Sequence, residues 1–230
     1  MAVDPITTAL VNVGEDAAKQ VASGFLSRIA GPAADEVGLM IQDKARLYRF
    51  KNQIKMLGKA QKMVESAGID PGAVPMRTLL PLMEGASLED DEDLNTKWAA
   101  LLANASDGEG LTVLPSFPDI LKQLSPHEAA ILNTLPTDRP PAPRKMTVFE
   151  LERVSERSGV PYEVMEPLVE NLQRLGIVTG TQRLDSGKMV ASHEGLDAIG
   201  LSHFGFLFLK ACRAPAAKAA EPATAGRRGA

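Results

Sequence analysis

The sequence predicts a mainly α-helical protein in two parts. The first is an N-terminal helical bundle with one long helix, and the second is a winged-helix-like module with a short two-stranded hairpin. Three observations favour this fold class. Apolar residues recur at steps of three and four along most of the chain. Aromatic residues make up only 4% of the 230 residues, so aliphatic side chains must form most of the core. A strand–turn–strand pattern is confined to one stretch near the C-terminal end.

Two helices are expected before residue 68. The first spans residues 4–30, with Asp4 as N-cap and Pro5 at the first helical position. The second spans residues 33–67 and is expected to end at Gly68. At 1.5 Å per residue it would be roughly 50 Å long. A helix of that length must pack against several elements or against another chain.

The long helix carries a run of basic residues, which makes it the main candidate interaction surface. The candidate residues on it are Arg46, Arg49, Lys51, Lys55, Lys59 and Lys62. Such a face can bind lipid headgroups, nucleic acid or an acidic protein, and it can equally be an ordinary solvated surface. Internal pairing is a third alternative, because Glu84 and the acidic residues 89–93 follow nearby in the sequence.

Two further helices are expected before the middle of the chain. A short one at residues 76–83 should be interrupted or ended near Pro81. The next should begin at Ser87, which forms a capping-box pattern with Asp90. Acidic residues fill its first turns, where the helix dipole favours negative charge. Trp98 is expected to be a core anchor on the buried face of this helix.

A segment with two prolines, residues 111–119, is the candidate domain boundary. We therefore expect a helical domain at residues 1–114, a winged-helix-like domain at residues 115–213 and a disordered tail at residues 214–230. Within the second domain, three helices and a hairpin are expected at residues 125–135, 147–158, 161–175 and 177–192. Thr147 should cap the second of these helices, and an apolar helix is expected at residues 200–213.

A winged helix often binds DNA by placing its third helix in the major groove. Here the third helix carries three acidic residues and one basic residue: Glu163, Glu166, Glu170 and Arg174. Phosphate binding needs a basic surface, so protein contact is favoured over DNA. The hairpin residues Arg183 and Lys188 are candidate interaction residues that keep DNA as an alternative.

No pattern typical of an enzyme is found, and we expect no catalytic activity, cofactor or metal. The three histidines have no zinc-ligand spacing, and Cys212 is the single cysteine. Glycine-rich phosphate loops and a GxSxG motif are absent. The longest uncharged stretches are shorter than the roughly 18 residues that a membrane-spanning helix needs. A cytoplasmic location is expected, with peripheral attachment to the inner membrane as an alternative.

Three segments carry a family resemblance. The sequence DEDLNTKWAALLANAS at residues 91–106 resembles the signature of the bacterial abortive infection alpha proteins. LSPHEAAIL at residues 124–132 resembles the start of the family's second block. Residues 200–213 resemble its closing Leu-Thr-x-x-Gly-x-x-Phe element, with Ser202 in the threonine position. The resemblance implies a role in phage defence, in which the infected cell stops growing or dies, and it implies no catalytic residues.

Together these observations favour a non-enzymatic phage-defence protein. It is expected to act through self-association as a homo-oligomer or through another protein partner. An anionic membrane surface is an alternative partner for the basic helix, because amphipathic helices with a basic face bind such surfaces. A winged-helix transcriptional regulator or adaptor that binds DNA or protein is the alternative function.

Overall fold

The computed structural model describes residues 28, 47–108, 113–138, 147–183, 189–191 and 195–217. The expected first helix, residues 4–30, lies outside this part of the chain except for Arg28. The beginning of the long helix, the turn of the hairpin and the tail from residue 218 also lie outside it.

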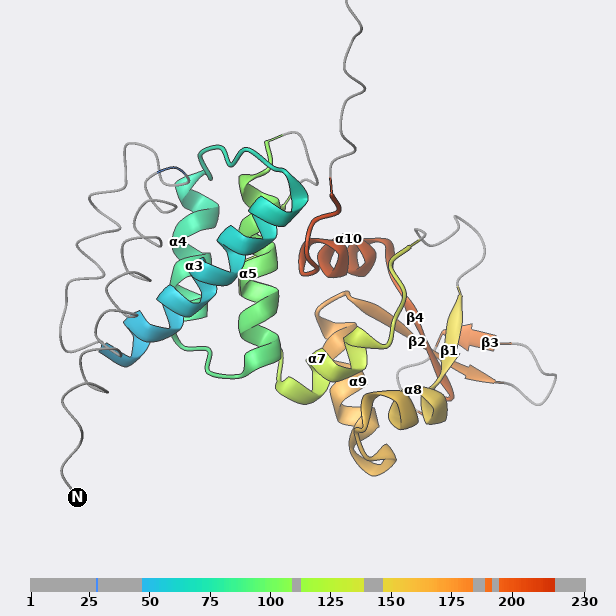
Figure 1. Ribbon diagram of the computed structural model, residues 1–230. Helices are drawn as coiled ribbons and strands as arrows, with labels where there is room; N and C mark the ends of the chain where they lie inside the picture. Colours follow the sequence, from blue (N-terminus) through green and yellow to red (C-terminus); the bar gives the residue numbers. More distant parts are fainter. Residues whose placement is uncertain are drawn as a thin grey trace, which may run out of the picture.

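Within the described residues, three helices pack together in the N-terminal part (Figure 1): α3 (Leu47–Ala67), α4 (Met76–Ser87) and α5 (Glu92–Ser106). α3 ends at Gly68, as predicted. The φ of Gly68 is 65°, a left-handed conformation that glycine adopts readily at a helix end. The backbone N–H of Ile69 then donates to the carbonyl of Val64 at 3.0 Å, which closes the last turn.

The boundary between α4 and α5 differs from the prediction. α4 does not end near Pro81 but continues through it to Ser87, because burial of the turns on both sides outweighs the one lost hydrogen bond. Ser87 is therefore the last residue of α4 and not the cap of the next helix. Asp91 caps α5 instead, because its carboxylate accepts from the backbone N–H groups of Asp93 at 3.0 Å and Leu94 at 2.9 Å.

The C-terminal part combines short helices with one antiparallel sheet. Its helices are α6 (Phe117–Leu121), α7 (Pro126–Asn133), α8 (Leu151–Ser158), the 3-10 turn η3 (Tyr162–Val164), α9 (Met165–Arg174) and α10 (His203–Ala211). The strands within the described residues are β1 (Val148–Glu150), β2 (Val178–Arg183), β3 (Met189–Ala191) and β4 (Ala198–Leu201). Their order in the sheet is β1-β4-β2-β3, and all neighbours are antiparallel.

The sheet is larger than the predicted two-stranded hairpin. β2 pairs with β3 where the hairpin was expected, but β4 pairs with the other edge of β2 and β1 pairs with β4. β1 takes the first residues of the helix that was expected at residues 147–158, so α8 begins only at Leu151 and Thr147 is not its cap. β4 similarly takes the start of the expected helix at 200–213, and α10 begins only at His203. β1 and β4 pair with each other across about 50 positions of the sequence, a contact that no local pattern reveals.

In the part of the chain that the structure describes, one hydrophobic core runs through both halves. Trp98 of α5 lies in it with 1% of its surface exposed, as predicted. Phe117 of α6 packs edge-on against Phe208 of α10, with ring centroids 5.4 Å apart and planes at 82°. α10 thereby packs between α5 and the sheet (Figure 1). The domain boundary after residue 114 stays a prediction.

Candidate functional site

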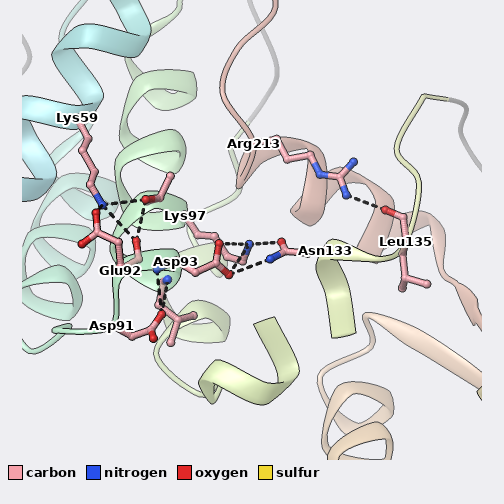
Figure 2. A network of polar contacts seen from close by, with 10 residues as sticks. Lys59, Asp91, Glu92, Asp93, Lys97, Asn133, Leu135 and Arg213 are labelled. Atoms are coloured by element: carbon pink, nitrogen blue, oxygen red, sulfur yellow. Dashed lines mark hydrogen bonds and ion pairs between the residues drawn. The ribbon is translucent and has the colours of Figure 1, made fainter. Parts of the chain in front are cut away.

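The N-terminus of α5 binds two of the candidate lysines of α3, Lys55 and Lys59, and Figure 2 shows the contacts of Lys59. Lys59 Nζ lies 2.7 Å from Glu92 Oε1 and donates to the hydroxyl of Thr96 at 2.8 Å. Lys55 forms a second ion pair with the same carboxylate. Hydrogen bonds from Lys55 and Lys59 lower the pKa of Glu92 to about 2. Both lysines therefore serve the packing of α3 on α5.

The other candidate basic residues lie in different situations. Lys51 and Lys62 are exposed on α3 and form no ion pair with any residue that the structure describes. Arg49 is half-buried at the start of α3. Arg183 is the last residue of β2, whereas Arg46 and Lys188 lie outside the described residues. Among the α3 candidates that the structure describes, Lys51 and Lys62 are therefore exposed and without an ion pair, and so available to a partner.

A second polar cluster joins α5 to α7 (Figure 2). Lys97 Nζ lies 3.2 Å from Asp93 Oδ2 and donates to the side-chain oxygen of Asn133. The amide of Asn133 donates back to Asp93 Oδ2 at 3.0 Å. Only 8% of the Lys97 side chain is exposed, so its ammonium group depends on these partners in place of water.

A third cluster connects the end of α5 to the end of α10. The side-chain amide of Asn104 donates to the carbonyl oxygens of Ala211 and Arg213, each at 2.9 Å. The guanidinium of Arg213 donates in turn to the carbonyl of Leu135 at 2.7 Å (Figure 2). The polar residues of the 91–106 motif are therefore structural, because they connect α5 with α3, α7 and α10.

The family's closing element, at residues 200–213, is structural as well. Ser202 Oγ caps α10 by accepting from the backbone N–H of Gly205 at 2.8 Å, and it donates to the carbonyl of Gly176 at 2.6 Å. Gly205 lies against the backbone of Ile177, where a Cβ would come within 2.0 Å of the carbonyl oxygen. These contacts hold α10 on the start of β2.

The junction of α8 and α9, which we call the elbow (residues 161–164), exposes apolar side chains. Tyr162 is 51% exposed and Val164 is 42% exposed, which is unusual for large apolar residues. Around the elbow lie exposed carboxylates of the third helix: Glu163, Glu166 and Glu170. One of them, Glu166, accepts from the backbone N–H of Gly195 at 3.1 Å. Sequence reasoning identified the acids but missed Tyr162, although Tyr162 is one of only two tyrosines.

A cleft of about 570 Å³ opens beside the elbow. It is lined by Thr134, Val148, Phe149, Glu150, Glu152, Arg153, Val154, Arg157, Tyr162, Asp197 and Ala198. Arg153 Nε lies 3.1 Å from Glu150 Oε2, so part of its charge is balanced within the chain. The sequence did not predict this cleft because β1 and β4 form two of its walls.

The remaining reactive group is the thiol of Cys212, which is fully buried at the end of α10. Burial raises its pKa to about 12, and the nearby charge of Lys97 opposes this shift only in part. The thiol is therefore neutral at physiological pH. Over the described ranges, no group of three His, Cys, Asp or Glu side chains is placed to hold a metal ion. None of the described helices is long and apolar enough to cross a membrane.

Comparison with known proteins gives one match. The model of the family described as abortive infection alpha matches residues 44–212. The matched segment contains the 91–106 motif, α3 from its first residue and the elbow. No curated protein and no solved structure matches the chain.

Proposed function

Because the chain belongs to the abortive infection alpha family, we propose that it is a non-enzymatic phage-defence protein that acts through contact of α3 with another protein molecule. The family match supports the defence role, in which an infected cell stops growing before phage is released. The contact mechanism rests on one observation, the exposed basic face of α3.

Three of the α3 lysines share one side of the helix. At 100° per residue, Lys51, Lys55 and Lys62 fall within about 40° of one another around the helix axis. Lys55 is already paired with Glu92, while Lys51 and Lys62 are exposed. An exposed row of this kind attracts an acidic surface, and the attraction weakens as salt is added.

The C-terminal part is proposed to be a winged-helix-like module that contacts protein. Its elements follow the order α7, β1, α8, α9, β2 and β3, which is helix, strand, helix, helix and hairpin. The exposed side of α9 carries Glu166 and Glu170, and η3 carries Glu163. These carboxylates would repel DNA phosphates, so protein contact is favoured over a DNA-binding regulator.

A phage-plating assay tests the proposal. The wild-type chain, expressed in a bacterial host, should reduce plaque formation by at least some phages of a broad panel. The Lys51→Glu/Lys62→Glu variant should lose most of this protection. Arg77→Glu/Lys210→Glu is the matched control, because it makes the same change in net charge at exposed sites on α4 and α10. It should protect like the wild type.

Two results would count against the proposal. Absence of protection by the wild type across the panel would argue against the defence role. Full protection by a folded Lys51→Glu/Lys62→Glu variant would remove α3 as the contact surface. Co-sedimentation with anionic vesicles tests the membrane alternative. If the protein binds vesicles through Lys51 and Lys62 and does not associate with protein, the partner is lipid.

A further inference from the structure

The elbow has the properties of a protein contact site. Tyr162 and Val164 expose apolar surface at 51% and 42%. The exposed carboxylates Glu163, Glu166 and Glu170 follow on the α9 side, and Arg153 and Arg157 of α8 line the cleft on the other side. An exposed apolar patch with a polar rim often marks an interaction surface. Tyrosine is among the residues that most often contribute strongly to binding at the centre of such surfaces. The three carboxylates make the α9 side of the elbow acidic, which favours a basic partner on that side.

The exposed face of α3 complements the α9 side of the elbow in charge. It presents Lys51 and Lys62 without partners among the described residues, at the two ends of a short row. Between them lies Gly58, where an added Cβ would meet nothing within 4 Å. Gly58 has no side chain, so the backbone there is open to a side chain of a partner, such as that of Tyr162. The acidic α9 side of the elbow, with Tyr162 beside it, thus matches the basic row of α3 in charge.

We propose that α3 of one molecule docks on the elbow of a second copy of the same chain. This inference rests on the proposed function: it identifies the protein that α3 contacts as a second copy of the chain, and the contacted surface as the elbow. A second copy is favoured over another protein because the chain carries both halves of the complementary pair. The glutamates Glu163 and Glu170 would then face Lys62 and Lys51 of the neighbouring molecule.

The position of the two surfaces determines the kind of assembly. α3 and the α8–α9 junction lie at opposite ends of the molecule (Figure 1). Two antiparallel molecules can form the contact twice and close a two-fold dimer. Where only one contact forms between a pair, each molecule keeps one free surface, and the contact builds a ring or an open chain. Because exposed ion pairs are individually weak and screened by salt, assembly should require low salt and high protein concentration.

A charge-swap experiment tests the inference. Sedimentation velocity at low salt should show that the wild type assembles in a concentration-dependent way. Lys51→Glu/Lys62→Glu and Glu163→Lys/Glu170→Lys should each be monomeric, since each brings like charges together. An equimolar mixture of the two variants should assemble again, because the reversed α3 of one matches the reversed elbow of the other.

Two further variants separate the contact from general charge effects. Tyr162→Ala should weaken assembly while leaving all charges in place. Arg77→Glu/Lys210→Glu should assemble like the wild type. Circular dichroism and thermal unfolding check that each variant is folded. If a charge variant is unfolded, Tyr162→Ala still tests whether the elbow takes part in assembly.

The outcomes distinguish this inference from the proposed function. A wild type that protects against phage but remains monomeric at low salt overturns the second-copy partner and leaves the defence role intact. Single variants that lose assembly without rescue in the mixture overturn the pairing of α3 with the elbow. A wild type that neither assembles nor protects overturns both.

Discussion

Replacing Gly205 by alanine should detach α10 from the sheet. The added Cβ would lie 2.0 Å from the carbonyl oxygen of Ile177 and 2.7 Å from its carbonyl carbon. Ordinary contact needs more than 3.4 Å, and both obstructing atoms belong to the backbone, so no side chain can rotate away. The first turn of α10 must therefore move by more than an ångström.

The cost follows from the contacts at that turn. Overpacking of this kind costs about 1–3 kcal/mol. The shift also weakens the hydrogen bond from Ser202 N–H to the carbonyl of Ile177, now 3.0 Å, and the Ser202 cap. Those losses contribute about 1 kcal/mol each. Alanine is better than glycine in a helix by up to about 1 kcal/mol, so the net loss should be about 2–4 kcal/mol.

Urea unfolding in high salt, where self-association is suppressed, measures this loss. The midpoint should fall while the slope with urea stays unchanged. Gly58→Ala is the matched control, because it makes the same chemical change in a helix where the Cβ meets nothing within 4 Å. It should raise stability by about 0.5–1 kcal/mol. Equal stability of Gly205→Ala and the wild type would refute the steric reasoning.

Two other predictions concern titratable groups. The pKa of Glu92 is held at about 2, below its usual 4.5. Its ion pairs with Lys55 and Lys59 therefore stabilise the fold fully above about pH 4.5, and this stabilisation is lost as the pH falls towards 2. Glu92→Gln should flatten this part of the stability–pH curve in urea titrations, and an unchanged curve would show that the pairs add nothing. The Cys212 thiol, with a pKa of about 12, should resist a disulfide reagent in the native protein at pH 8 and react fully in urea. Rapid reaction of the native protein would contradict its burial.

Features that depend on neighbouring residues could be predicted from the sequence. The end of α3 at Gly68 follows from the conformational freedom of glycine. The start of α7 follows from a complete capping box, in which Ser125 and Glu128 satisfy each other's backbone N–H groups. Gly159, with a φ of 71°, ends α8 as expected. In each case the decisive contacts lie within a few residues, so the pattern contains the information.

Features decided by tertiary contact could not be predicted. The sequence placed the start of α5 at Ser87, but α4 continues through Pro81 to Ser87, and Asp91 caps α5 instead. The strand pairing of Val148 with Gly200 joins segments too short to show an alternating pattern.

The candidate site shows the same division. The sequence identified the basic row of α3 and left internal pairing open, but it could not say which lysines were paired. Glu92 lies 33 residues after Lys59, and only the packing of α5 on α3 brings them together. The exposure of Tyr162 could not be predicted for the same reason, because a tyrosine that follows a proline can be either buried or exposed.

The family motifs and the proposed site therefore belong to different parts of the molecule. Lys97 and Asn104 bind other elements of the same chain and Asp91 caps α5, so their replacement would reduce protection by destabilising the protein. Loss of activity in such a variant cannot locate a contact surface. Lys51 and Lys62 stabilise nothing in the described structure, and loss of protection after their reversal would report on contact alone. Rescue by a second reversal at the elbow would then identify the surface that they bind, which no motif variant can do.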